Sequence, residues 1–176
     1  ITGTDSNKYA MGLYQKDLFN YSYLIPKAES SEYWNVITEI VKRHQIDYAI
    51  ILPEAEVLEW SKKTQKELPC KSLIPDYRIS NVLINKSKMT EMLNPIGVVP
   101  HSVEIDREQT SFSEVFDKLH TPFWVRGCSG TSGIGSYKIK DERQLIEWIK
   151  INSNVKKFLA SEYLPGRNLA CKMLYY

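Results

Sequence analysis

The chain has 176 residues, of which 43% are hydrophobic and 25% charged, a composition typical of a globular protein with an ample core. Its net charge of +2 comes from scattered basic residues and gives no reason to expect a nucleic-acid partner. No apolar run reaches the ~18 residues of a membrane span. Cys70, Cys128 and Cys171 lie far apart, without the spacing of a metal or redox site. We therefore expect a cytoplasmic protein without a membrane span or a membrane partner.

Strand and helix patterns alternate through the first part of the chain. An apolar stripe predicts a helix that begins near Tyr33, and residues 53–68 also look helical. The run 47–52 is almost continuously apolar, as expected of a strand buried on both faces of a parallel sheet. Strand patterns occupy residues 1–5, 21–25, 47–52 and 71–74. This order predicts a doubly wound α/β domain, whose ligands bind at the carboxyl ends of the strands.

Two carboxylates follow strands of this domain. Asp5 and Glu54 are therefore candidate site residues, although carboxylates in such places are commonly solvated or close a turn. Asp5 on a ribose would also suit a dinucleotide enzyme. That hypothesis needs a Gly-X-Gly turn before Ile1, which the sequence does not contain.

The pattern changes after Asp76, and we expect the domain boundary near Lys86. One broken helix or two short ones should occupy residues 79–93, followed by a break at 94–100. Ser111 and Glu114 form a capping-box pattern before one helix, and Asp141 precedes another. Strand patterns at 157–164 and 168–176 complete an α+β second part. We expect domains at 1–85 and 86–176.

A glycine-rich stretch connects two strand patterns in this second part. The run Phe123–Arg126 ends in a cation, residues 127–136 contain four glycines and four hydroxyl side chains, and Tyr137–Lys140 alternates apolar and charged residues. This predicts a hairpin whose long tip could surround a polyphosphate with backbone N–H groups, beside Arg126. It is not a P-loop, because no Gly-Lys-Ser/Thr follows. The alternative is a mobile surface hairpin, and Cys128 within it is a reactive or, more simply, a bystander thiol.

The ordered motifs resemble the ATP-grasp family. They are Lys86 at a helix start, Gly97–Pro100, Val125–Arg126, the loop Gly127–Ser136, and Glu162–Gly166. The first part, from Gly3 to Tyr14, looks like the pre-ATP-grasp domain of proteins similar to the carbamoyl-phosphate synthase large subunit. The resemblance implies an α/β fold in which a Rossmann-like parallel sheet precedes an α+β ATP-grasp lid subdomain.

The resemblance also implies an ATP site. Lys86 and Arg126 would contact the phosphates, which the loop backbone would cover, and Glu162 would accept from the adenine amino group. Asn168 stands where a glutamate often binds the ribose hydroxyls. Three of these residues have a structural alternative. Lys86 could be a solvated lysine, Arg126 could pair with a carboxylate across the sheet, and Glu162 could lie on a solvent face. The implied ATP-binding residues are Lys86, Arg126, Ser129, Gly130, Thr131, Ser132, Gly133, Gly135, Glu162, Tyr163, Leu164 and Asn168.

Members of this family join a small-molecule carboxylate to an amine or ammonia through an acyl phosphate, and oligomers are possible. Their Mg2+ is held by a late Glu and a Glu-X-Asn set, which would lie beyond Tyr176, so we expect neither catalytic residues nor metal ligands here. The chain starts without methionine and ends within a strand pattern, so we expect a fragment that is incomplete at both ends and inactive alone. The alternative is a non-catalytic nucleotide-binding or regulatory module, which Asn168 and Lys172 mildly favour.

Overall fold

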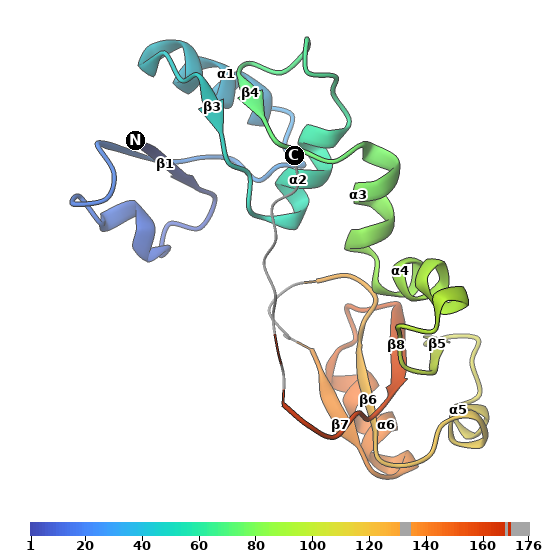
Figure 1. Cartoon of the computed structure of the whole chain (residues 1–176). Helices are drawn as coiled ribbons and strands as arrows, with labels where there is room; N and C mark the ends of the chain where they lie inside the picture. Colours follow the sequence, from blue (N-terminus) through green and yellow to red (C-terminus); the bar gives the residue numbers. More distant parts are fainter. Residues whose placement is uncertain (131–134, 168, 170–176) are drawn as a thin grey trace. The chain divides into compact units, whose positions relative to one another are not determined.

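The computed structural model describes residues 1–130, 135–167 and 169 (Figure 1). Backbone contacts divide the chain into unit 1, Ile1–Asn81, and unit 2, Val82–Tyr176. The division falls inside the helix α3 (Tyr77–Ile84), slightly before the boundary expected near Lys86. Helices and strands are mixed in both units, in agreement with the predicted fold class.

Unit 1 contains two pairs of parallel strands with helices between them. Thr2 lies opposite Tyr21 in the first pair, and Tyr48 opposite Lys71 in the second. The parallel pairing confirms the expected α/β pattern, although the strands form two separate two-stranded sheets. The elements before α3 are β1 (Thr2–Asp5), η1 (Met11–Tyr14), β2 (Tyr21–Leu24), α1 (Tyr33–His44), β3 (Tyr48–Ala49), α2 (Glu54–Ser61) and β4 (Lys71–Ser72).

The core of unit 1 differs from expectation in one respect. The run 47–52 was expected to be a strand buried on both faces, but Ile50 is 79% and Leu52 81% exposed. The prediction is wrong because regular pairing stops at Ala49, and no strand of the described part of the chain pairs with the residues after it. The buried core centres instead on Tyr33 of α1 and Trp60 of α2, which are hydrogen-bonded to each other.

Unit 2 is built on a four-stranded antiparallel sheet in the order β5-β8-β6-β7 (Figure 1). The strand β5, which was not predicted from the sequence, pairs with β8 along its whole length. The broken helical pattern is resolved as two helices, α3 and α4. The elements after α3 are α4 (Lys86–Leu93), η2 (Asn94–Ile96), β5 (Ser102–Asp106), α5 (Phe112–Lys118), β6 (Phe123–Gly127), β7 (Tyr137–Ile139), α6 (Glu142–Ile151) and β8 (Lys157–Glu162).

Strand alternation gives this sheet two unlike faces. The helical face packs its apolar side chains with those of α5 and α6, and Phe123, Val125 and Phe158 on it are completely buried. The other face, which we call the polar face, carries mainly polar and charged side chains. By strand register these are Ser102, Glu104, Asp106, Trp124, Arg126, Lys138, Lys157 and Ser161, with Leu159 among them.

The two helices on the helical face begin differently. Asp141 caps α6 as predicted, since its carboxylate accepts from the Gln144 N–H at 2.9 Å. Ser111 precedes α5, but its hydroxyl contacts the Ser113 hydroxyl at 2.8 Å and caps no backbone N–H. The predicted capping box is therefore wrong at its first residue. None of the helices that the structure describes is both long and apolar enough to span a membrane.

Candidate functional site

The glycine-rich stretch forms the predicted hairpin between β6 and β7. Phe123 lies opposite Ile139, so the two strands are antiparallel on either side of the loop. Gly130 and Gly135 have φ values of +110° and +75°, a backbone conformation that other residues rarely adopt. A residue with a side chain at either position would strain the backbone of the loop. Thr131, Ser132 and Gly133 lie outside the described residues.

The beginning of this loop is fixed from two sides. The Cys128 N–H donates to the Lys157 carbonyl at 3.0 Å, and the Cys128 carbonyl accepts from the Lys86 N–H at 2.8 Å. The Lys86 ammonium also donates to the Gly130 carbonyl. Lys86 opens α4, whose first turn is capped by the Asn85 side chain. The structure thus places Lys86 against the loop and not as a freely solvated lysine.

Arg126 lies on the polar face at the base of the loop. Its Nε is buried and has no hydrogen-bond partner among the described residues. No carboxylate in the described part of the chain lies within 4 Å of the guanidinium, so the alternative of an ion pair across the sheet finds no support there. A buried N–H without a partner costs roughly 1–3 kcal/mol. An anionic ligand would remove that cost.

Cys128 is only 5% exposed. Burial raises the pKa of its thiol to about 11, so the reactive thiolate is strongly disfavoured at neutral pH. The structure therefore favours the bystander interpretation of this cysteine: its backbone holds the loop, and its side chain fills space beneath it.

The predicted adenine-binding end is at the far end of β8. Glu162 lies opposite Phe123, whereas Leu159 lies opposite Arg126, so the Glu162 side chain starts from the helical face and is exposed. Strand alternation continues onto the polar face at Tyr163, whose ring lies 3.9 Å from the Lys138 ammonium. The structure does not bring Glu162 beside Arg126. Leu164 is 63% exposed, and Asn168 lies outside the described residues.

The sequence analysis missed Lys138, Glu104 and Lys157 on the polar face. The Glu104 carboxylate accepts from the Lys157 ammonium at 2.6 Å and from the Ser87 hydroxyl. These hydrogen bonds lower the pKa of Glu104, so the carboxylate is ionised at neutral pH. Alternation within Tyr137–Lys140 was the available signal for Lys138. The alternation of Ser102–Asp106 was the corresponding signal for Glu104, but β5 was not recognised.

The two strand-end carboxylates belong to unit 1. Asp5 accepts from the Asn7 N–H at 2.7 Å, which closes a turn directly after β1. Glu54 lies in the first turn of α2, where a negative charge is favourable. Both positions fit the structural reading given for them above.

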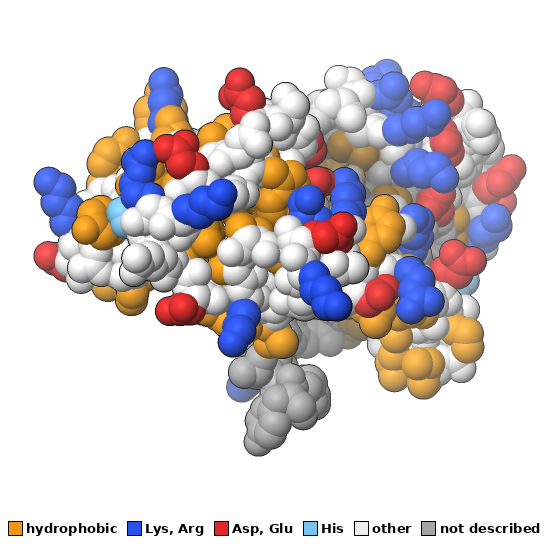
Figure 2. Space-filling model, turned by 90° about the horizontal axis from the view of Figure 1, so that it is seen from above, with side chains coloured by type: hydrophobic (Ala, Val, Ile, Leu, Met, Phe, Trp, Pro, Cys, Tyr) orange, Lys and Arg blue, Asp and Glu red, His pale blue; other side chains and the backbone are white. Residues whose placement is uncertain are grey.

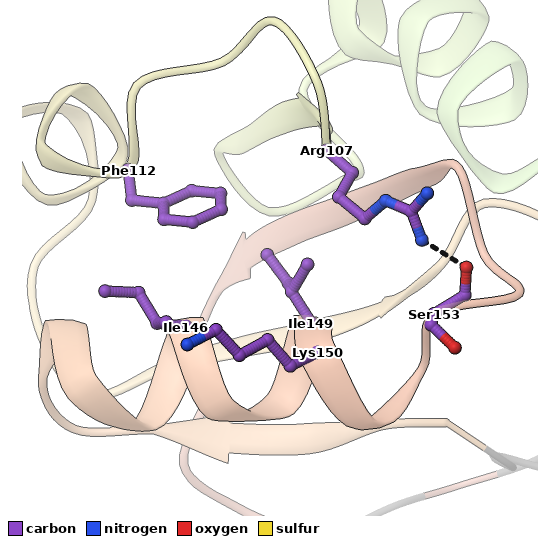
Figure 3. Close-up of a pocket in the computed structure, with 6 residues that line it drawn as sticks. All are labelled: Arg107, Phe112, Ile146, Ile149, Lys150 and Ser153. Atoms are coloured by element: carbon purple, nitrogen blue, oxygen red, sulfur yellow. Dashed lines mark hydrogen bonds between the residues drawn. The ribbon is translucent and has the colours of Figure 1, made fainter.

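A surface hollow of about 320 Å³ lies where α6 meets the segments around α5 (Figure 3). Its apolar wall is made by Phe112, Ile146 and Ile149, and the Arg107 guanidinium donates to the Ser153 carbonyl at one end. None of the residues implied in ATP binding lines it. The hollow is therefore separate from the candidate site.

Charges of both signs are interspersed on the surface drawn in Figure 2, as the small net charge suggests. Among residues 1–130, 135–167 and 169, no three His, Cys, Asp or Glu side chains are grouped so that they could hold a metal ion. The candidate site itself contains two cations, Lys86 and Arg126, beside the glycine loop, and cations suit an anion.

Comparison with known proteins identifies the fold. No family model matches the chain, and no curated protein matches its sequence. Solved structures do match, and they show that this is the fold of the ATP-grasp enzymes.

Three of these structures indicate the range of the similarity. D-alanine–D-alanine ligase from Bacillus anthracis complexed with ATP has a TM-score of 0.64 and 15% identity over 94% of this chain and 59% of its own. The ADP complex of N5-carboxyaminoimidazole ribonucleotide synthetase has a TM-score of 0.65 and 14% identity over 94% and 41%. L-amino acid ligase from Bacillus licheniformis has a TM-score of 0.60 and 18% identity over 84% and 34%. The chain therefore spans between a third and three fifths of these enzymes.

Proposed function

We propose that this chain is the ATP-binding portion of an ATP-dependent ligase. The observation that carries the proposal is the Arg126 guanidinium, whose buried Nε lacks a partner among the described residues at the base of a glycine loop. Two structures of similar fold are described as ATP and ADP complexes, which supports a nucleotide as the missing anion. The narrower resemblance to the carbamoyl-phosphate synthase large subunit stays a prediction.

The phosphate end of the site fits the residues present. Arg126 supplies a fixed positive charge, and Lys86 supplies a second one at the same loop. The Lys86 ammonium now contacts the Gly130 carbonyl, so binding would exchange a neutral oxygen for a charged one. Ser129, Gly130 and Gly135, together with Thr131, Ser132 and Gly133, would cover the phosphates with their N–H groups.

The adenine end would be formed by the residues that follow β8. Glu162 would accept from the amino group, and the backbone of Tyr163 and Leu164 would meet the ring edge. Because Glu162 starts from the helical face, its carboxylate would have to reach the ring around the end of the strand. Asn168 would bind a ribose hydroxyl. The phosphate end is the better supported of the two.

Magnesium does not fit the described residues, which contain no group of three metal-ligating side chains. We derive no step through a metal here. The role that we assign to this chain is to position the nucleotide and to neutralise charge at the transferring phosphoryl group. In the whole enzyme the acceptor would be a small-molecule carboxylate, activated as an acyl phosphate and then attacked by an amine or ammonia.

Calorimetric titration with ATP tests the proposal, with NADH as the competing ligand class. Arg126→Met keeps most of the apolar stem but removes the guanidinium, so it should lower ATP affinity at least tenfold, since a charge-assisted hydrogen bond is worth about 1.5–3 kcal/mol. Arg143→Met is the matched control, because Arg143 lies on α6 with its side chain 86% exposed. Equal ATP affinity in both variants would remove Arg126 from the site, and binding of NADH instead of ATP would favour a dinucleotide enzyme.

The second candidate is a nucleotide-binding or regulatory module without catalysis. It is favoured by Asn168, an uncharged residue where a glutamate is common, and by Lys172 where an acidic residue is common. Both candidates predict ATP binding. They differ in whether the full-length protein turns ATP over in the presence of carboxylates and amines.

A further inference from the structure

We propose that Glu104 is a positioning residue that holds Lys86 and the start of the glycine loop in place for phosphate binding. This inference rests on the proposed function for its consequence, but the contacts themselves do not depend on any ligand. Glu104 lies on β5, a strand that contributes none of the implied ATP-binding residues. Its influence is therefore exerted through its neighbours.

The contacts form a closed ring within unit 2. The Glu104 carboxylate accepts from the Ser87 hydroxyl and, at 2.6 Å, from the Lys157 ammonium. The Lys157 carbonyl accepts from the Cys128 N–H at 3.0 Å. The Cys128 carbonyl accepts from the Lys86 N–H at 2.8 Å, and Lys86 is bonded covalently to Ser87. Four parts of the fold, the start of α4, β5, β8 and the loop, are joined through this ring.

The Glu104 carboxylate is the charged group that connects Ser87 of α4 to Lys157 of β8 and so completes the ring. Without it, the hydrogen bonds through the backbone of Cys128 would be the part of the ring that still joins the first turn of α4 to β8. The Ser87 hydroxyl and the Lys157 ammonium would then lose the acceptor they share, and α4 could move away from the sheet. Lys86 is the first residue of α4, so such a movement would displace both its N–H and its ammonium from the loop.

Register places the ring beside Arg126. Arg126 lies opposite Leu159 on β8, and Leu159 lies opposite Glu104 on β5, so the three side chains form one row on the polar face. Two strand spacings separate the ends of this row, or roughly 10 Å. The described residues contain no ion pair between Glu104 and Arg126, since the Glu104 carboxylate pairs with Lys157 instead. Glu104 thus acts on the cation at α4 and leaves the Arg126 guanidinium without a competing carboxylate.

The test is Glu104→Gln in the full chain, with amide hydrogen exchange measured in the absence of nucleotide. The amides to follow are those of Lys86 and Cys128, whose N–H groups make the two backbone bonds of the ring. We expect their protection to fall by about threefold to fivefold, the effect of losing a partly exposed ion pair. Ser87→Ala should act in the same direction. Glu147→Gln is the matched control, because it removes the exposed Arg143–Glu147 ion pair from α6.

Charge reversal distinguishes positioning from a general loss of stability. The variant Glu104→Lys/Lys157→Glu restores the ion pair with opposite signs, and Ser87 can then accept a hydrogen bond from the new lysine. This variant should recover the protection of Lys86 and Cys128. The two single variants, Glu104→Lys and Lys157→Glu, should each lose protection. If the double variant does not recover it, the effects are ordinary destabilisation and the inference is overturned.

ATP titration of the same variants supplies the functional arm. If the unmodified chain binds ATP, Glu104→Gln should weaken binding by a similar threefold to fivefold, and the charge-reversed variant should restore it. Unchanged affinity in Glu104→Gln would overturn the role in phosphate binding. If the unmodified chain binds no ATP, the proposed function fails, while the exchange measurements still decide whether Glu104 positions Lys86.

Discussion

The two faces of the β5-β8-β6-β7 sheet use the same strands for different purposes. On the helical face Phe123, Val125 and Phe158 are fully buried against α5 and α6. On the polar face Trp124 remains 37% exposed, and Arg126 keeps a buried Nε without a partner among the described residues. Successive side chains of β6 thus alternate between the buried core and the polar face. This strand therefore both stabilises unit 2 and presents the charge of Arg126.

The difference indicates where a ligand would stabilise the protein. The helical face packs its apolar side chains against one another, although the Nε1 of Trp148 beside this cluster also lacks a hydrogen-bond partner among the described residues. The polar face has a polar atom whose burial has an energetic cost that a ligand would offset. Arg126 differs from Trp148 because its side chain is charged, so an anionic ligand could satisfy its Nε with a charge-assisted hydrogen bond.

The largest expected effect is a difference in the free energy of unfolding between variants on the two faces. Phe158→Ala removes a completely buried ring between β6, β5 and the helices, so the free energy of unfolding should fall by about 3–5 kcal/mol. Trp124→Ala removes a larger side chain from the polar face, but that side chain is already partly exposed, and the expected loss is about 1 kcal/mol. Urea unfolding followed by circular dichroism would measure both. Equal losses would mean that the two faces are packed alike.

The next effect concerns the end of β6, where burial extends to the loop. Cys128 has a pKa of about 11 because it is buried, so at pH 8 only about one thiol in a thousand is ionised. In a variant with Cys70→Ser and Cys171→Ser, iodoacetamide should modify Cys128 about two hundredfold more slowly than an unperturbed thiol. The rate should rise about tenfold per pH unit from pH 8 to 10. Mass spectrometry would follow the modification. A modification rate that stops rising near pH 9 would show that the Cys128 thiol is accessible to solvent and that the start of the loop is open.

Much of the sheet could be predicted from the sequence. Phe123–Arg126, Tyr137–Lys140 and 157–164 contain short alternating or apolar runs, and all became strands that pair as a hairpin and its neighbour. The strand β5 was missed although Ser102–Asp106 alternates strictly, with Val103 and Ile105 between polar residues. The run is only five residues long, and its place in the sheet depends on long-range pairing with β8, which local patterns do not contain.

The site could be predicted only in part for the same reason. Lys86 and the loop are 44 residues apart at the Gly130 contact, and only the ordered motifs of the family suggested that they meet. The face of each side chain depends on strand register, so the separation of Glu162 from Arg126 was not visible beforehand. The buried Nε of Arg126 depends on packing, which no sequence pattern specifies.

The smallest expected effect tests whether the polar face is organised beyond Arg126. Lys138 lies with its ammonium 3.9 Å from the Tyr163 ring centre, a cation–π contact that connects the hairpin to the residues after β8. A double-mutant cycle of Lys138→Ala and Tyr163→Leu should give a coupling of about 0.5–1 kcal/mol in the free energy of unfolding. Lys140→Ala, on the exposed residue after β7, is the control.

ATP affinity measured on the same four proteins of the cycle shows whether Lys138 acts through Tyr163 or on the nucleotide directly. If Lys138→Ala weakens ATP binding only as much as Tyr163→Leu does, the contact acts by holding the turn after β8. If Lys138→Ala weakens it more, and the double variant is no worse than Lys138→Ala, the ammonium contributes its charge to the nucleotide directly. A coupling of zero would contradict the cation–π contact and would leave the polar face with two independent ends, one at Arg126 and one at Tyr163.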